Sequence, residues 1–310
     1  MRADKLHDGP VAVLLGGNSA ERDISLQSGE TVVTALRSLD CEVRPVDPAD
    51  ADWMVQLQGV SAAFIALHGP GGEDGSVQGA LQALNIPFTG SGVLGSALAM
   101  DKLRSKQLWQ GIGLATGGFV SLSPETDWQA VIDRFGKVFV KPACEGSSIG
   151  MTSADNAADL QAAYGLASQY AGEVLAEQFI DGPEYTVAVL GEQALPSIRL
   201  ETDNEFYDYE AKYLSEETRY HCPSGLNARE EAQLAALALR AFHSLGCSVW
   251  GRVDVMRASN GDFYVLEVNT IPGMTSHSLE PMAAAAAGQH NAALVQRNLD
   301  MSREGWRQHG

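Results

Sequence analysis

A short segment near the end of the chain carries charged side chains at a spacing suited to binding a cation. Residues 252–269 read RVDVMRASNGDFYVLEVN, and Asn260-Gly261 predicts a hairpin with a two-residue turn in which both residues have positive φ. Side chains alternate along a strand, so this hairpin has one polar and one apolar face. In cross-strand pairs, the polar face carries Asp254 opposite Glu267 and Arg252 opposite Asn269, and the apolar face carries Val253, Val255, Leu266 and Val268.

The polar face has the chemistry of a magnesium site. Two carboxylates directly opposite one another on neighbouring strands repel unless a cation lies between them. Asp254, Glu267 and the amide oxygen of Asn269 are hard ligands, which suit Mg²⁺ when phosphates and water complete its shell. The alternative is a solvated hairpin face on which two carboxylates meet by chance.

A loop rich in glycine and serine could bind phosphate. It begins at Lys141 and reads KPACEGSSIG, and backbone N–H groups of such a loop can wrap phosphate oxygens. It lacks the GxxxxGK[ST] pattern of a P-loop. Lys141 ends an apolar strand, where a lysine needs an anionic partner such as a nucleotide phosphate. Lys102, in the segment MDKLRSK, is a second candidate. An ordinary polar loop and a solvated surface lysine are the alternatives.

The stretch that follows the segment VLAE could bind the rest of a nucleotide. Glu177 and Glu184 flank the residues Gln178, Phe179 and Ile180. Carboxylates, an apolar wall and exposed backbone together suit ribose hydroxyls and adenine. Two ordinary surface carboxylates are the alternative reading.

Three further loops carry groups that could bind a small polar substrate. In GGNSAERDISLQSG, Glu21 could hold an ammonium group, or it could favour the N-terminus of the next helix. In HGPGGEDGSVQG, closely spaced glycines surround His68, as expected where backbone lies tight against a ligand. In NTIPGMTSHS, Gly273 offers an N–H group, and Ser278 could bind a carboxylate at a helix start or simply cap the helix.

The elements that position these loops alternate between strand and helix at the start of the chain. This order predicts an α/β domain with a parallel sheet, in which ligands gather at the carboxyl ends of the strands. Glu21 and His68 follow two such ends. The predicted strands are residues 11–15, 42–46 and 64–67, and the predicted helices are residues 23–37 and 76–84.

The chain is predicted to form three domains, with boundaries after residues 100 and 184. Residues 1–100 form the parallel-sheet domain, residues 101–184 carry the phosphate loop, and residues 185–310 carry the hairpin. Residues 203–226 show no apolar periodicity. A loop this long inside a compact domain is usually a functional lid or a disordered insertion.

Composition excludes several classes of protein. The 310 residues have a net charge of -18, which disfavours binding to nucleic acid or to anionic membranes. The four cysteines lack metal-ligand spacing, so reduced thiols are expected. The N-terminal residues do not resemble a signal peptide, and no apolar run approaches the length of a membrane span. These features predict a cytoplasmic protein.

Taken in order, these motifs resemble the ATP-grasp enzymes and, among them, the D-alanine–D-alanine ligase family. The resemblance extends from residue 11 to about residue 299. Its most specific segments are GGNSAERDISLQSG, HGPGGEDG, GSGVLGSALAMDKLRSK, KPACEGSSIGM, YDYEAKY, WGRVDVM and LEVNTIPGMTSHS.

The resemblance implies the ATP-grasp fold, which is α+β overall: an N-terminal Rossmann-like domain followed by two α+β subdomains that clasp ATP. It also implies that ATP phosphorylates the carboxylate of one D-alanine and that the amine of a second D-alanine attacks the acyl phosphate. The product would be D-alanyl-D-alanine for peptidoglycan synthesis, made by a homodimer in the cytoplasm.

The resemblance also implies roles for individual residues. ATP would be bound by Lys102, Lys141, Glu177, Gln178, Ile180 and Glu184. Two Mg²⁺ or Mn²⁺ ions would be bound by Asp254, Glu267 and Asn269. The catalytic residues would be Glu21, Ser147, Tyr213, Arg252, Lys212 and Gly273, and the D-alanine-binding residues would be His68, Ser278 and Leu279.

A few positions depart from the family pattern. Pro70 and the pair Ala143-Cys144 replace basic or polar residues, and Gln178 stands where lysine is common. Two other functions fit the motifs less well. A D-alanine–D-lactate ligase is disfavoured by Tyr213, and a catalytically silent nucleotide-binding module is disfavoured by the retained lysines and metal-ligand candidates.

Overall fold

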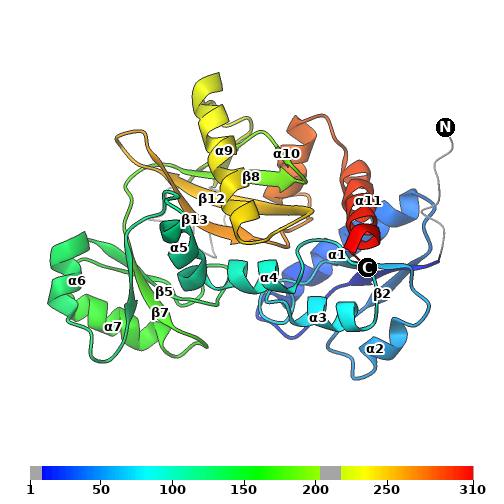
Figure 1. The fold of residues 1–310 in the computed structure, drawn as a ribbon, viewed down its shortest axis with the longest axis horizontal. Helices are drawn as coiled ribbons and strands as arrows, with labels where there is room; N and C mark the ends of the chain where they lie inside the picture. The colour runs from blue at the N-terminus through cyan, green and yellow to red at the C-terminus, as the bar shows by residue number, and fades with distance from the viewer. Residues whose placement is uncertain (1–8, 203–217, 310) are drawn as a thin grey trace.

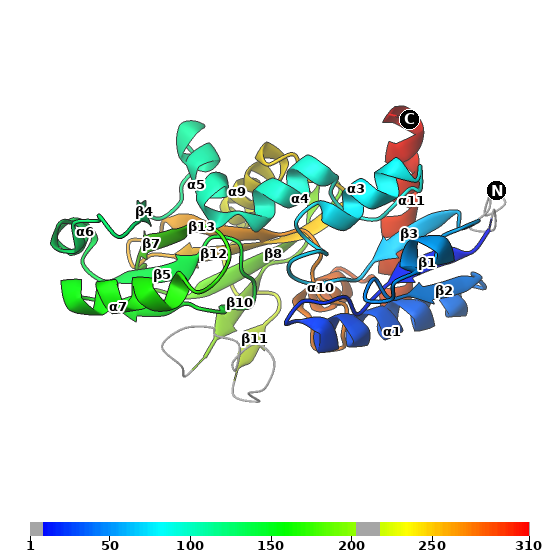
Figure 2. The ribbon, with the colours of Figure 1, turned by 90° about the horizontal axis from the view of Figure 1, so that it is seen from below.

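The first sheet is parallel and packs against helices from both ends of the chain. The computed structural model describes residues 9–202 and 218–309. In this sheet β1 (Val11–Leu14) is central, between β2 (Val43–Val46) and β3 (Ala62–Ile65). Every residue of β1 and β3 is buried, as expected for parallel strands that are covered on both faces. Figure 2 shows α1 (Arg22–Ser38) along one face of this sheet and α11 (Asn291–His309) close by. The remaining helices of this region are α2 (Trp53–Gln56) and α3 (Ser76–Ala83).

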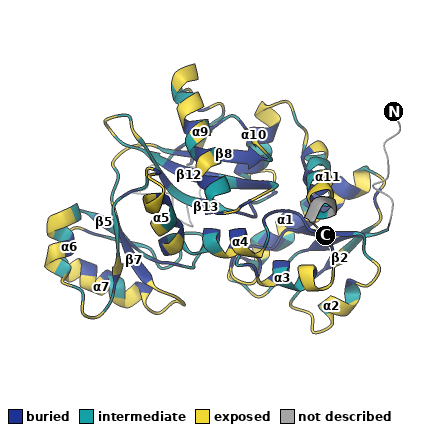
Figure 3. Ribbon diagram, in the orientation of Figure 1, coloured by how far each residue is buried: buried dark blue, intermediate teal, exposed yellow. Residues whose placement is uncertain are grey.

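A second, antiparallel sheet carries its own small core. Its strand order is β4-β7-β5-β6, and α6 (Trp128–Phe135) and α7 (Ala157–Ala167) cover it. Side chains of these helices and strands, such as Val131, Leu160 and Val140, are buried together. Figure 3 shows the outer faces of both helices exposed. The strands are β4 (Phe119–Leu122), β5 (Val138–Pro142), β6 (Thr152–Ala154) and β7 (Val174–Gln178).

The third sheet is the largest, and it is antiparallel with the order β11-β10-β8-β12-β13. The helix α9 (Ala228–Ser244) packs on it and begins with a capping box, in which Asn227 and Glu230 each accept a backbone N–H of the other. The helices α4 (Val93–Met100), α5 (Lys102–Gly111) and α10 (Leu279–Ala286) complete this region. The strands are β8 (Glu184–Leu190), β9 (Gln193–Ala194), β10 (Ile198–Glu201), β11 (Arg219–His221), β12 (Trp250–Arg257) and β13 (Phe263–Asn269).

The largest core runs through two of the three sheets. Buried side chains of β1 and β3 are continuous with those of α10, α11 and one face of β8 and β10. Trp250 of β12 contacts Phe64 of β3 edge to face, with 5.8 Å between the ring centroids. The first and third sheets therefore share one hydrophobic interior. The domain boundaries after residues 100 and 184 stay a prediction.

The predicted hairpin register is confirmed, but its turn and its apolar face differ from the prediction. Asp254 pairs with Glu267 and Arg252 with Asn269. The turn has three residues rather than two: Ala258 and Asp262 are hydrogen bonded across residues 259–261, and Gly261 has φ 90° whereas Asn260 does not have positive φ. The extra residue shifts the register near the turn, where Val255 pairs with Val265.

A bulge in β13 restores the predicted register for the pairs that include Asp254 and Glu267. It leaves Leu266 without a cross-strand partner between the Asp254–Glu267 and Val255–Val265 pairs. Leu266 was expected on the apolar face, but Val265 is buried there instead. Leu266 lines a cavity next to Glu267. The extra residue in the turn and the extra residue in β13 shift the register in opposite directions, so the pairs far from the turn are unchanged. The sequence pattern therefore did not reveal the bulge.

No helix among residues 9–202 and 218–309 is long and apolar enough to cross a bilayer.

The contact between α1 and Leu15, the residue that follows β1, yields a stability prediction. A Cβ atom at Gly29 would lie 2.4 Å from Cβ of Leu15, which has no freedom to move aside. Gly29→Ala should therefore lower the free energy of unfolding by roughly 1–3 kcal/mol, despite the better helix propensity of alanine. Gly165→Ala in α7 is the matched control, because that position faces open space. It should stabilise by up to about 1 kcal/mol. Thermal or urea unfolding measures both, and a stable Gly29→Ala variant would contradict the tight packing.

Candidate active site

Two adjoining cavities lie where the three sheets approach one another. The larger has a volume of about 660 Å³, and the smaller has a volume of about 350 Å³. Lys102, Glu145 and Glu267 line both cavities. Groups bound in the two cavities would therefore meet at these three side chains.

All six residues predicted to bind ATP line the smaller cavity. Its walls are mixed: Phe139, Met256 and Leu266 add apolar surface, and the segment after β7 adds backbone. Flat apolar surface beside exposed backbone is the environment a purine base requires. The six predicted residues are Lys102, Lys141, Glu177, Gln178, Ile180 and Glu184.

Glu177 lies between two lysines, one of which the sequence reasoning missed. Its carboxylate bonds Nζ of Lys141 at 2.8 Å and also forms an ion pair with Lys106. Burial would raise the pKa of Glu177, but the positive charges of Lys106 and Lys141 outweigh burial and hold that pKa below its usual value. Lys106 is one helical turn beyond Lys102, and this spacing could have indicated a shared face.

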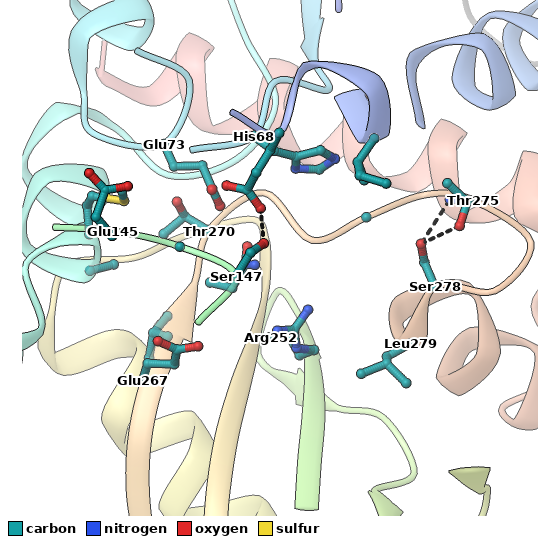
Figure 4. A pocket seen from close by; sticks show the side chains of 18 of the residues that line it. His68, Glu73, Glu145, Ser147, Arg252, Glu267, Thr270, Thr275, Ser278 and Leu279 are labelled. Atoms are coloured by element: carbon teal, nitrogen blue, oxygen red, sulfur yellow. Dashed lines mark hydrogen bonds between the residues drawn. The ribbon is translucent and has the colours of Figure 1, made fainter. Parts of the chain in front are cut away.

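The larger cavity brings Glu21 and Ser147 together from loops more than a hundred residues apart. The Ser147 hydroxyl donates a hydrogen bond to the Glu21 carboxylate, drawn as a dashed line in Figure 4. Glycines make this approach possible: a Cβ at Gly69 or at Gly146 would lie 2.8 Å from Oε2 of Glu21. Gly69 also has φ 71°, a conformation that favours glycine.

His68 is buried beside the same cavity and is held by two partners. One ring nitrogen, Nδ1, lies 3.0 Å from the carbonyl oxygen of Ile271, and the other, Nε2, lies 3.1 Å from the hydroxyl of Ser28. The carbonyl can only accept, so Nδ1 donates to it, and in the neutral ring Nε2 accepts from Ser28. Burial lowers the pKa of His68 more than the charge of Glu21 raises it, which favours the neutral imidazole.

Glu73 is a second carboxyl group in this cavity to which the sequence gave no role. Its Oε2 accepts a hydrogen bond of 2.7 Å from the N–H of Gly69. Burial and the nearby charge of Glu21 raise the pKa of Glu73 to about 8. Near neutral pH this group is therefore mostly an uncharged acid.

The hairpin carboxylates face cations supplied by the chain itself. Arg252 donates two hydrogen bonds of 2.8 Å to Asp254, and Thr186 donates a third of 2.6 Å. Nζ of Lys102 lies 3.0 Å from Oε2 of Glu267. Asp254 lines neither cavity, whereas Glu267 lines both.

The donor set nevertheless fits a divalent cation. Asp254, Glu267 and Asn269 present hard oxygen atoms from paired positions of two strands. Residues 9–202 and 218–309 contain no cluster of three or more His, Cys, Asp or Glu side chains suited to a metal. A cation bound by these three side chains would complete its shell with phosphate oxygens and water.

The far end of the larger cavity is built around the start of α10. Gly273, Ser278 and Leu279 all line it. The Ser278 hydroxyl is 3.0 Å from the N–H of Thr275 and makes no capping hydrogen bond to α10. Simple helix capping, the alternative weighed for Ser278, is therefore wrong.

Two predicted catalytic residues lie outside the described part of the chain. These are Lys212 and Tyr213, together with most of the predicted lid at residues 203–226. Thr218 and Tyr220, which follow directly, line the larger cavity. Glu145 and Thr270 also line it and were not predicted.

Comparisons with known proteins agree with one another over almost the whole chain. The family model "D-ala D-ala ligase C-terminus" matches residues 108–300, and "D-ala D-ala ligase N-terminus" matches residues 49–91. A D-alanine–D-alanine ligase of Alkalilimnicola ehrlichii is 57% identical over 281 residues, which is 90% of either chain.

Solved structures show the same similarity. A D-alanine–D-alanine ligase from Bacillus anthracis superposes with a TM-score of 0.89 at 32% identity, covering 97% of this chain and 100% of that one. The same enzyme complexed with ATP gives 0.87 at 30% identity with the same coverage. The VanG D-Ala:D-Ser ligase from Enterococcus faecalis gives 0.82 at 27% identity, covering 96% of this chain and 100% of that one.

The raised pKa of Glu73 predicts a pH dependence of stability. Between its ordinary value of 4.5 and about 8, the folded protein binds a proton that the unfolded chain has lost. The stability gained from Glu73 is therefore present below pH 4.5 and is lost as pH rises through about 8. Glu73→Gln keeps the shape of the side chain and is neutral at every pH. As the pH rises from about 6 to about 9, the free energy of unfolding of the variant should increase by at least about 1 kcal/mol relative to that of the wild type.

Thermal unfolding without ligands measures this gain. Exposed Glu173, which lies outside both cavities, supplies the control Glu173→Gln. A constant difference between wild type and Glu73→Gln across the range would show that Glu73 is charged in the folded protein.

Proposed function

This chain belongs to the D-alanine–D-alanine ligase family, and on that premise we propose that it joins two D-alanine molecules into D-alanyl-D-alanine, converting ATP to ADP and phosphate. The product serves the synthesis of peptidoglycan precursors. The observation that supports this most directly is the pair of cavities that share Lys102 and Glu267. Such an arrangement allows a phosphoryl group in one cavity to reach a carboxylate in the other.

On the nucleotide side, Lys102 and Lys141 bind the phosphates of ATP. Gln178 and Ile180 contact the base through backbone, and Glu184 bonds the ribose. Their common position in the smaller cavity supports these roles. Mg²⁺ or Mn²⁺, held by Asp254, Glu267 and Asn269, would neutralise phosphate charge and so lower the barrier to phosphoryl transfer. Lys212 contacts the transferred phosphoryl group.

On the amino-acid side, Glu21 binds the ammonium group of the first D-alanine and His68 lies beside that substrate. Arg252 and the N–H of Gly273 donate to the oxyanion that forms when the second amine attacks the acyl phosphate. Both line the larger cavity together with Asn269. Preorganised donors at this place cost no rearrangement during the reaction.

The second D-alanine lies nearer to α10. Ser278 and the N–H of Leu279 bind its carboxylate, and the Glu21–Ser147 hydrogen bond, extended by Tyr213, orients its amine. The position of Ser278 at the N-terminus of α10, without a capping bond of its own, supports this role. A homodimer in the cytoplasm completes the proposal and is supported by the family resemblance.

The test is release of phosphate from ATP with either enantiomer of alanine. We expect release with D-alanine in the presence of Mg²⁺, with D-alanyl-D-alanine as the product, and none above background with L-alanine. D-Lactate and D-serine, offered as competing second substrates, should give minor products. Equal release with and without D-alanine, or no dipeptide, would refute the ligase assignment.

Glu267→Gln should nearly abolish turnover while leaving the fold intact. The change removes the negative charge that faces Lys102 at 3.0 Å and that would bind the cation, and the cation accounts for several kcal/mol of barrier reduction. Steady-state kinetics with thermal unfolding measures both effects. Glu173→Gln, on the surface outside the cavities, should retain wild-type rates. Near-wild-type turnover of Glu267→Gln at saturating Mg²⁺ would rule out Glu267 as a ligand.

A further inference from the structure

One lysine buried behind the nucleotide cavity has no role in the reaction as described above. Lys106 of α5 exposes 1% of its side chain, and it does not line either cavity. Its ammonium group forms an ion pair with Glu177 and donates a hydrogen bond of 2.8 Å to Thr116. A buried lysine is costly unless its charge is matched, so its presence calls for a physical reason.

The first part of the reason is the charge of the cluster. Glu177 is one anion between two cations, Lys106 and Lys141, so the three side chains together carry one excess positive charge. Burial lowers the pKa of Lys106, the charge of Glu177 opposes that shift, and the charge of Lys141 adds to it, so that the pKa lies below its ordinary value. Lys141 is the more exposed of the two lysines, at 14% of its side chain, and it alone lines the nucleotide cavity.

The second part is a chain of hydrogen bonds from this cluster to the hairpin. Thr116 donates to the carbonyl oxygen of Val265 at 2.8 Å, and the N–H of Val265 donates to Ala115 at 3.0 Å. Val265 adjoins the bulge residue Leu266 and is two residues from Glu267. Lys106 therefore connects the end of β7 with the strand that carries the shared carboxylate.

We propose that Lys106 is a positioning residue for nucleotide binding: by neutralising Glu177 it leaves the charge of Lys141 for the phosphates and fixes that lysine relative to the hairpin. If Lys106 were absent, the remaining Glu177 and Lys141 would form an ion pair with no net charge. Lys141 would then have to leave its partner in order to bind an anion. The inference rests on the proposed role of Lys141 as a phosphate ligand.

A purely structural role predicts a different result. If Lys106 only fills the interior between α5 and its neighbours, a methionine of similar length should fill the same space, and Glu177 keeps Lys141 as its charged partner. Any loss of binding should then affect the nucleoside and the nucleotide equally. The ratio of ATP affinity to adenosine affinity separates the two roles, since adenosine lacks phosphates.

The experiment measures this ratio by calorimetry, without D-alanine, for several variants of the full chain. In Lys106→Met and in Lys106→Gln, the ratio should fall about tenfold, as expected for the loss of one charge-assisted hydrogen bond. Adenosine affinity should stay within about twofold of the wild type. In the double variant Lys106→Met/Glu177→Gln, Lys141 has no competing carboxylate, and the ratio should recover. Lys106→Gln carries the test if the methionine variant does not fold.

Two controls make the outcomes distinguishable. Arg104→Met removes another cation of α5, one that pairs with Glu173 at the surface, and should leave the ratio unchanged. Lys141→Met should lower the ratio at least as much as Lys106→Met. If Lys141→Met lowers it and both Lys106 variants do not, this inference is refuted and the proposed function stands. If Lys141→Met also leaves it unchanged, the assignment of Lys141 to phosphate fails, and the inference fails with it.

Discussion

The pairing of β12 with β13 determines where the reacting groups lie. One face of this hairpin is part of a buried core, through Val253, Val255, Val265 and Val268. The other face is thereby held at the boundary between the two cavities, with Glu267 open to both. A shift of the strands by one residue would exchange the two faces, burying the carboxylates and exposing the valines. The cost of that exchange keeps the register unique, and with it the position of Glu267 between the two cavities.

Three basic side chains that line the cavities each form an ion pair with a neighbouring carboxylate. Arg252 bonds Asp254, Lys102 lies against Glu267, and Lys141 lies against Glu177. Such pairing limits the penalty of holding charges in partly buried places.

Local sequence patterns predicted the features that depend on neighbouring residues. The alternation in the hairpin predicted the register of Asp254 with Glu267, and the parallel sheet followed from the order of elements. The predicted ATP-binding residues lie together in one cavity, although their roles remain predictions. The bulge at Leu266, the buried Lys106 and the uncharged Glu73 could not be predicted in the same way. Each depends on packing between segments far apart in sequence, which alternation and composition do not report.

The distribution of the cores has a mechanical consequence. The first and third sheets share one interior, whereas the four-stranded sheet has its own, and a small apolar cluster around Leu103, Ala143 and Leu175 joins it to α5. Rotation of the four-stranded sheet against the rest would expose little apolar area, while separation of the other two sheets would break a common core. The four-stranded sheet is thus the part that can rotate as a unit, and the smaller cavity lies between it and the third sheet. A rotation of this kind would widen the smaller cavity as a rigid-body motion, without unfolding either core.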